Sequence, residues 1–558
     1  MAQITGGKFM AQALKAYGVT HVFVAPAIAR EALAEMSALG VKSIVTHGEK
    51  SAAYMADGYA RAANRPGICF AQSVGAANLA AGLQDPYLAM SPVIAMTGRK
   101  TPMEQEKNAY QEIEHSKPFA SVTKFSAYVE RVEQLPYLMR QAFREATSGT
   151  PMPVHLDLQG MAANVIMQTE GDLELVVEDS FTHRPAFRPE ASPDTVLKAA
   201  QRLSAAQRPV IVAGGGVTAS QAEREVVELA EMLSIPVATS LNAKGCITEN
   251  HPLSVGVVGS YSRWCANRVV AEADLVIFVG SHTGSQVTNE WRVPVEGTPV
   301  IQIDIDPSEL GRSYPNEVSL HGDAKATLRR MIEALEPIGG RNEWVSRAQE
   351  LVKDWREEVA PRVNSDAVPI IPERLCHELT QALPENAILV ADTGHAGIWT
   401  GSMVDLNHAG QSYIRCAGSL GWGLPGAMGV QCAEPDRPVI CFTGDGGLWY
   451  HIGELDTAVR YNIPVVTVVN NNQGLLQNKR GDDRGYANVE GADSSELWQF
   501  NDVDLSKVAE SMGAFGIRVT QPGDIQSAIE QALASGRPAI VDVATDPADS
   551  EAPVPWAP

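Results

Sequence analysis

The sequence has little positive charge and no long apolar run, and each absence excludes a class of function. Its 558 residues carry 44 lysines and arginines against 66 aspartates and glutamates, a formal net charge of −22. A nucleic-acid surface needs clustered basic side chains, so we expect no nucleic-acid partner. No run is long enough to cross a bilayer, and the N-terminus lacks the apolar core and cleavage site of a signal peptide. We therefore expect a cytoplasmic protein without a membrane partner.

Cysteine is also scarce and unpatterned. The seven cysteines are scattered and none forms a CxxC pair. This spacing favours reduced thiols and offers no structural zinc motif. The hydrophobic content of 45% and the charged content of 20% are typical of a globular protein, and the chain length suggests several domains.

Apolar runs alternate with helical segments along the chain. Examples are "PGICFAQS" near the N-terminus, "ADLVIFVG" in the middle and "IPVVTVVNNN" near the C-terminus. This alternation is typical of parallel α/β sheets covered by helices. We predict three doubly wound parallel-sheet domains at residues 1–165, 191–335 and 366–545. We expect an acidic, proline-rich linker at 162–190 and a charged connecting helix at 342–363.

Residues 442–474 place polar clusters at the ends of two apolar segments joined by a helix. A right-handed crossover makes such strands parallel, so Asp445 and the asparagines at 470–472 should emerge at one sheet edge. Carboxylate and amide oxygens suit Mg²⁺. Gly444, Gly446 and Gly447 would let a bulky anion approach the backbone. The pattern predicts a metal-bridged diphosphate site; a capped turn without a ligand is the simpler alternative.

This pattern resembles the signature of thiamine diphosphate (ThDP) enzymes, and nearly the whole chain resembles the acetolactate synthase-like superfamily. The resemblance implies pyrimidine-binding, central Rossmann-like and diphosphate-binding domains in the three predicted regions. It implies that Asp445 and Asn472 bind Mg²⁺ through side chains and Gly474 through its carbonyl. Counting from Pro464 favours Asn472 over the two asparagines before it. It further implies a small-molecule substrate and a homodimer or homotetramer with active sites between subunits.

The segment "IVTHGEKSAAYMADGYARA" resembles the glutamate-bearing turn of the family, with Glu49 opening a helix. ThDP uses its own amino group as a base, which requires an acid at the pyrimidine N1′ atom. The resemblance assigns that role to Glu49. Taken alone, a first-turn glutamate could simply complement the helix dipole.

Other positions take their roles from the same resemblance. In "CAGSLGWGLPGAMG", Leu420 would lie between the two cofactor rings and the backbone of Gly418 would contact the pyrimidine. Gly394 and His395 match the turn beside the diphosphate. Tyr110 and Gln111 match residues that reach the reaction centre, although "YQE" is a weak motif and His395 could be an ordinary core histidine.

Two regions depart from the family. The stretches "AGGGV" and "IDIDPSE" lie where relatives hold FAD or ADP, but Ser281 and His282 stand where an arginine is usual. FAD is therefore doubtful, while ADP or CoA fits. The tryptophan that follows the asparagines in acetolactate synthases is missing. Lys479 and Arg480 lie in that region and could face phosphate or carboxylate groups, those of an acyl-CoA included, or could be solvated loop charges.

These departures lead us to favour a 2-hydroxyacyl-CoA lyase giving formyl-CoA and an aldehyde or ketone. The alternative is an acetolactate synthase-type carboligase or 2-oxo acid decarboxylase acting on pyruvate-like substrates. Two other classes of protein fit the sequence less well. The joint presence of Glu49, Asp445 and Asn472 speaks against a catalytically silent regulator. A nicotinamide dehydrogenase needs an acidic ribose ligand, and "IPVATSLNAKG" offers none.

Overall fold

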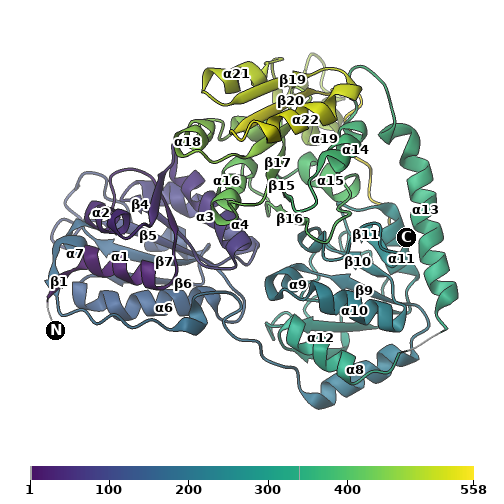
Figure 1. Cartoon of the computed structure of the whole chain (residues 1–558), viewed down its shortest axis with the longest axis horizontal. Coiled ribbons are helices and arrows are strands. Elements are labelled where there is room, and N and C mark those ends of the chain that lie inside the picture. Colours follow the sequence, from purple (N-terminus) through teal and green to yellow (C-terminus); the bar gives the residue numbers. More distant parts are fainter. Residues whose placement is uncertain (1–2, 338–339) are drawn as a thin grey trace.

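The computed structural model describes residues 3–337 and 340–558 and contains three six-stranded parallel sheets, each flanked by helices (Figure 1). The predicted three-domain α/β fold is thus confirmed. A short antiparallel pair joins β1 (Ile4–Thr5) to β8 (Glu170–Gly171). Across the described ranges, no helix combines the length and apolar character needed to cross a membrane.

The first sheet has the strand order β3-β2-β4-β5-β7-β6. Its interior strands are buried on both faces, because α1 and α6 cover one face while α3 and α4 cover the other. The strands are β2 (His21–Val24), β3 (Lys42–Val45), β4 (Gly67–Gln72), β5 (Val93–Arg99), β6 (Phe125–Val129) and β7 (Val154–Gln159). The helices are α1 (Gly6–Ala16), α2 (Arg30–Ala38), α3 (Glu49–Ala63), α4 (Gly75–Leu88), α5 (Ser116–Ala120), α6 (Leu135–Thr147) and α7 (Asn164–Gln168).

The central sheet has the order β11-β10-β9-β12-β13-β14, which is the dinucleotide-fold order. Its strands are β9 (Pro209–Ala213), β10 (Val237–Thr239), β11 (Ser254–Val257), β12 (Leu275–Val279), β13 (Val300–Asp304) and β14 (Asn316–His321). Its helices are α8 (Pro193–Ala205), α9 (Gly215–Ser220), α10 (Glu223–Leu233), α11 (Trp264–Glu272) and α12 (Ala324–Glu333). The long helix α13 (Asn342–Val363) connects it to the third domain, as the sequence predicts.

The third sheet has the order β16-β15-β17-β18-β20-β19. Its strands are β15 (Ile388–Ala391), β16 (Ser412–Arg415), β17 (Val439–Gly444), β18 (Val466–Asn471), β19 (Phe515–Val519) and β20 (Ala539–Ala544). Its helices are α14 (Pro372–Ala382), α15 (His395–Ser402), α16 (Gly423–Ala433), α17 (Asp445–Trp449), α18 (Glu454–Tyr461), α19 (Leu476–Tyr486), α20 (Ser495–Trp498), α21 (Leu505–Ser511) and α22 (Ile525–Ala534).

Helices α3 and α16 join the first domain to the third and share one apolar core (Figure 1). Glycines permit this close approach. A Cβ atom at Gly58 would lie 2.0 Å from the carbonyl oxygen of Gly426, and one at Gly429 would lie 1.9 Å from that of Met55. The two helix backbones therefore contact each other directly, which fixes the loops that precede both helices.

The segment expected as a linker is packed on the first domain. It contains α7 and β8, and its Arg184 guanidinium donates to the Asn64 side chain (3.2 Å) and to the carbonyl of Arg61 (3.3 Å). The domain boundaries stay predictions, but the chain continues to pack on the first domain beyond residue 165.

Candidate active site

A cavity of about 240 Å³ lies at the carboxyl edge of the third sheet. The loops after β15, β16, β17 and β18 form it, and the central domain contributes Tyr261. Ligands of parallel α/β sheets bind at this edge. Predicted site residues that line it are Gly394, His395, Gly418, Leu420, Gly444, Gly446, Gly447, Asn472 and Gly474.

A carboxylate, a carboxamide and a backbone carbonyl converge beside this cavity. Asp445 starts α17 directly after β17, and a terminal amide atom of Asn472 lies 3.3 Å from both Asp445 Oδ1 and the carbonyl oxygen of Gly474. Burial raises the pKa of the Asp445 carboxyl to about 7, although backbone hydrogen bonds lower it. A divalent cation would compensate the buried charge, and this donor set suits Mg²⁺. No group of three or more His, Cys, Asp or Glu side chains in the described ranges is placed to hold a metal, so a metal here depends on this mixed set.

The asparagines at 470–472 have different surroundings. The Asn470 side-chain oxygen accepts from the Thr545 hydroxyl at 2.6 Å. The Asn471 amide donates to Asp542 at 2.8 Å. Asn470 and Asn472 both line the cavity, but it is the terminal amide group of Asn472 that faces Asp445. The geometry therefore supports Asn472, rather than its neighbours, as the predicted ligand.

The glycines around Asp445 allow close packing as well as ligand approach. A Cβ atom at Gly447 would lie 2.7 Å from the Thr443 hydroxyl oxygen, and one at Gly446 would lie 2.6 Å from the Leu475 side chain. A Cβ atom at Gly444 would meet only the carbonyl oxygen of Asn470, at 3.9 Å. A side chain at Gly446 or Gly447 would thus crowd neighbouring side chains, so packing as well as a ligand accounts for these two glycines.

The turn after β15 places a histidine in the cavity. Gly394 adopts φ +68°, and a side chain there would come within 2.4 Å of the Gln477 amide oxygen. His395 begins α15, and burial lowers its pKa to about 4, so the imidazole is neutral near pH 7. Within residues 3–337 and 340–558 its Nδ1 atom is buried without a partner. An unpaired buried nitrogen beside a cavity fits a bound polar group such as a diphosphate.

Asp392 is a site residue that the sequence analysis missed. Its carboxylate accepts from the amides of Thr393 (2.7 Å) and Gly421 (3.2 Å) and from the Thr443 hydroxyl (3.1 Å). It therefore joins the loops after β15 and β16 to the end of β17. Burial raises the pKa of this carboxyl to about 6. Its position directly after a buried strand was the available signal, the same one that identified Asp445.

The remaining predicted catalytic residues lie outside this cavity in the same chain. Glu49 begins α3, and its carboxylate accepts from the Asn78 amide at 3.2 Å. The carbonyl of Gln111 accepts from the Ser73 hydroxyl, and the neighbouring Tyr110 is 73% exposed. Glu49 and Gln111 are thus both held at the start of α4. One chain carries two separate parts of the predicted site.

Lys479 and Arg480 also lie outside the cavity. Lys479 Nζ is 2.9 Å from Asp483 on the same helix and lies over the Trp498 ring. Arg480 is exposed. Their substrate role stays a prediction, and the Asp483 pair favours the alternative of solvated charges.

A second cavity, of about 310 Å³, lies at the carboxyl edge of the central sheet. Gly215 and Gly216 of "AGGGV" line it, and the glycines of this stretch permit contact between loops. A Cβ atom at Gly214 would lie 2.2 Å from the carbonyl oxygen of Gly280, and one at Gly216 would lie 2.7 Å from the Gly280 Cα atom. These two glycines are thus required by the backbone packing, whether or not a ligand is present.

Some polar groups in this second cavity have unused hydrogen-bonding capacity. The hydroxyls of Ser240 and Thr283 are buried without hydrogen-bond partners in the described parts of the chain. Ser281 is buried and accepts from the Thr283 amide at 3.3 Å, whereas His282 is partly exposed near Glu309. The cavity therefore offers hydroxyl groups to a ligand.

Comparison with known families identifies all three domains. Residues 4–118, 196–331 and 392–543 match the N-terminal TPP binding, central and C-terminal TPP binding domains of thiamine pyrophosphate enzymes. These matches define a ThDP-dependent enzyme that makes or breaks carbon–carbon bonds. The chain belongs to the thiamine pyrophosphate enzyme family, in its acetolactate synthase-like branch.

Curated relatives cover nearly the whole chain. A probable acetolactate synthase large subunit of Methanocaldococcus jannaschii is 34% identical over 99% of this chain and 93% of its own length. An acetolactate synthase of Arthrospira platensis is 31% identical over 97% of this chain and 94% of its own. A glyoxylate carboligase of Escherichia coli O157:H7 is 31% identical over 89% of this chain and 84% of its own. These relatives support the carboligase alternative better than the favoured 2-hydroxyacyl-CoA lyase.

Proposed function

We propose that the protein is an acetolactate synthase-type carboligase dependent on ThDP and Mg²⁺. One 2-oxo acid such as pyruvate loses CO₂, and its remaining two carbons bond to the carbonyl carbon of a second 2-oxo acid. Two pyruvate anions and one proton would give one acetolactate anion and one CO₂. The observation that carries the proposal is the convergence of the Asp445 carboxylate, the Asn472 carboxamide and the Gly474 carbonyl beside this cavity. The relatives supply the type of reaction.

The third domain would hold the cofactor. Asp445, Asn472 and the Gly474 carbonyl would bind Mg²⁺ and thereby the diphosphate, while Leu420 would support the bent cofactor between its rings. When bound, ThDP supplies a carbon nucleophile for the substrate carbonyl and takes up the electron pair released with CO₂. Glu49 would hold a proton at the pyrimidine N1′ atom.

The separation of Glu49 from the cavity leads us to propose a homodimer, or a homotetramer built from two such dimers. Each active site would combine Glu49, Tyr110 and Gln111 of one copy with the third-domain cavity of another. Exposed apolar side chains near these parts, Val74 and Tyr450, would be covered by the second copy.

Mixing two inactive variants tests this arrangement. In a heterodimer of E49A and D445A chains, one site keeps both residues and the other has lost both. We expect the mixture to regain activity after subunit exchange, whereas each variant alone stays inactive. A mixture that stays inactive, although mass spectrometry detects the heterodimer, would contradict a site between subunits.

The cavity lining favours a small oxygen-rich substrate. Gln477 and Asn478 line it just after the proposed metal-binding loop. Acetolactate synthases have a tryptophan in this region of the sequence. Carboxamides can hydrogen-bond a 2-oxo acid, whereas a long acyl chain needs an apolar wall. This lining, rather than Lys479 and Arg480, guides the substrate proposal.

For the central cavity we propose an adenine nucleotide, either ADP or the nucleotide part of CoA, rather than FAD. The unpaired hydroxyls of Ser240 and Thr283 support a polar ligand, and Ser281 and His282 replace the arginine expected for flavin. Heat-released ligand would be identified by chromatography and absorbance. Flavin bands in the purified protein would refute this assignment.

The reaction itself is tested with three substrates. Protein loaded with ThDP and Mg²⁺ is incubated separately with pyruvate, with pyruvate plus glyoxylate, and with a 2-hydroxyacyl-CoA. We expect acetolactate and CO₂ from the first mixture, and a mixed carboligation product from the second if glyoxylate serves as acceptor. Release of aldehyde and formyl-CoA from the third mixture, with no acetolactate from pyruvate, would restore the lyase interpretation.

A further inference from the structure

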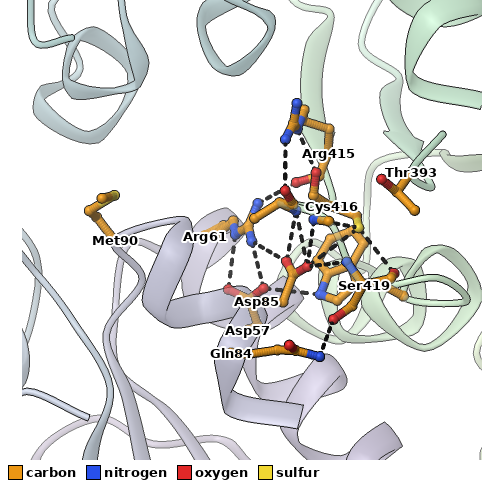
Figure 2. A network of polar contacts seen from close by, with 12 residues as sticks. Asp57, Arg61, Gln84, Asp85, Met90, Thr393, Arg415, Cys416 and Ser419 are labelled. Carbon is orange, nitrogen blue, oxygen red and sulfur yellow. Dashed lines mark hydrogen bonds and ion pairs between the residues drawn. The ribbon is translucent and has the colours of Figure 1, made fainter. Parts of the chain in front are cut away.

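A buried carboxylate of the first domain holds the cofactor-facing loop of the third. Asp85, on the last turns of α4, is fully buried. Its carboxylate accepts hydrogen bonds from three consecutive amides, those of Ala417 (2.9 Å), Gly418 (3.1 Å) and Ser419 (3.0 Å) (Figure 2). These residues directly precede Leu420, which lines the cavity.

Arg61 supplies a positive charge beside the buried Asp85 carboxylate. Its guanidinium lies 3.1 Å from Asp85 and also donates to the carbonyl of Arg415, at the end of β16 (Figure 2). Both ends of the turn are thus fixed from the first domain. Hydrogen bonds to an ionised, buried acceptor are stronger than neutral ones, so the loop is held in one conformation.

A second buried carboxylate crosses the same interface in the opposite direction. Glu454, at the start of α18 in the third domain, is 2% exposed. It accepts from the backbone amide of His47 at 3.0 Å, and the Thr457 hydroxyl donates to its other oxygen at 2.8 Å. His47 lies two residues before Glu49. The third domain therefore holds the turn that presents Glu49.

We propose that Asp85 and Glu454 are positioning residues that fix the two cofactor-facing turns of one chain. Asp85 sets the 417–420 loop for the pyrimidine ring, and Glu454 sets the turn before Glu49. Neither touches the cofactor. This inference rests on the site proposed above and adds two residues that act through others.

The two residues should affect different properties because they hold different turns. Loss of the Asp85 acceptor frees a loop that contacts the cofactor in its ground state, so the Kd for ThDP rises. Loss of the Glu454 acceptor moves an acid that acts on bound cofactor, so exchange of the ThDP C2 proton slows at an unchanged Kd. A merely structural role would lower thermal stability without this separation.

The first experiment compares D85N with D57N. Asp57 is equally buried and binds Arg61 (2.9 Å) and the Trp422 indole (3.0 Å), but it accepts from none of the three loop amides. Calorimetry at saturating Mg²⁺ measures the Kd for ThDP. We expect an increase of about ten- to a hundredfold for D85N and little change for D57N, from the loss of charged hydrogen bonds. Equal Kd values for D85N and the unaltered protein would overturn the Asp85 role.

The second experiment compares E454A with E454Q. The glutamine keeps an acceptor for the His47 amide and a partner for the Thr457 hydroxyl, whereas alanine removes both. We expect C2 proton exchange at least about tenfold slower in E454A, with the Kd for ThDP within about twofold, and near-normal exchange in E454Q. Normal exchange in E454A would overturn the Glu454 role.

A measurement on the unaltered, cofactor-free protein decides the case should a variant fail to fold. Hydrogen exchange followed by mass spectrometry on the peptide spanning residues 415–422 should show slow exchange of the amides that Asp85 accepts. Exchange as fast as in an unstructured peptide would overturn the proposal. Failure of the unaltered protein to bind ThDP would instead overturn the proposed site, so the two failures are distinguishable.

Discussion

The first and third domains are built on the same strand order but differ at the carboxyl edge of the sheet. In each, the loop after the corresponding edge strand carries a predicted cofactor contact: Glu49 follows β3, and Gly418 follows β16. Interior strands β15, β17 and β18 of the third sheet end at Asp392, Asp445 and the asparagines, whereas β2 of the first sheet ends at an alanine and a proline. The shared scaffold places the loops, and the side chains at the edge determine which domain can hold an anion and a metal.

The largest effect, a loss of ThDP binding, is expected when a carboxylate at the edge of the third sheet is removed. D445A deletes the carboxylate of the proposed metal site, so a diphosphate would face the backbone without charge neutralisation. We expect no measurable retention of ThDP after gel filtration in Mg²⁺. D436A is a matched control, because Asp436 is exposed on a loop of the same domain. Full activity of D445A would reject the metal assignment.

A change in the first domain should lower catalytic activity but leave ThDP binding unchanged. E49Q keeps the shape of the side chain and loses its acid, and we expect it to bind ThDP with activity reduced by about a hundred- to ten-thousandfold. Exchange of the C2 proton, followed by deuterium incorporation, measures the step directly. E35Q, at an exposed position of the same domain, is the control. An unchanged exchange rate in E49Q would remove the proposed role.

The strands that the sequence analysis quoted show where prediction from sequence succeeds. The three quoted runs "PGICFAQS", "ADLVIFVG" and "IPVVTVVNNN" became β4, β12 and β18, and each is an interior strand of its sheet. Interior strands are buried on both faces and therefore read as continuous apolar runs. Edge strands such as β14 and β6 alternate buried and exposed residues, and they were not quoted.

Site residues likewise divide into those that the sequence reveals and those that only the structure reveals. Asp445 and Asn472 were found because both follow interior apolar strands that must be parallel neighbours. Asp85 and Glu454 lie within helices, and only the packing of α3 and α4 against the third domain gives them partners far away in the sequence. Such contacts leave no local pattern. Asp392 could have been found by the rule that identified Asp445.

The asparagines at 470–472 allow a ligand-binding role to be separated from a stabilising role within one domain. N472A should weaken binding of Mg²⁺ and ThDP with little change in the stability of the cofactor-free protein. N471A removes a hydrogen bond to the buried Asp542, so we expect a loss of about 1–3 kcal/mol in the free energy of unfolding and an unchanged Kd per folded molecule. Denaturant titration and calorimetry measure the two quantities. The opposite assignment of effects would show that the ligand is Asn471.

The smallest effect concerns two buried histidines, one in each of the compared domains. Burial lowers the pKa of His395 to about 4 and that of His155 to about 3, from an ordinary value of 6.5. The folded state therefore binds fewer protons than the unfolded state between these values, and the stability present above pH 6.5 is lost as the pH falls towards 4. Relative to H395Q, we expect the cofactor-free protein to lose about 1–3 kcal/mol over this range, the lower end allowing for partial exposure of His395.

Bound cofactor should act on only one of these histidines. Negative charge from a diphosphate beside His395 favours its protonated form, so saturating ThDP and Mg²⁺ should reduce the pH-dependent difference between H395Q and the unaltered protein. His155 stacks on Phe119 and bonds to Thr97 at 2.7 Å, away from the cavity, so the difference measured with H155Q should stay the same. Thermal unfolding at pH 5 and pH 7 measures the difference between each variant and the unaltered protein, with and without cofactor. An equal response of both histidines to ThDP would mean that the cofactor stabilises the whole chain without lying next to His395.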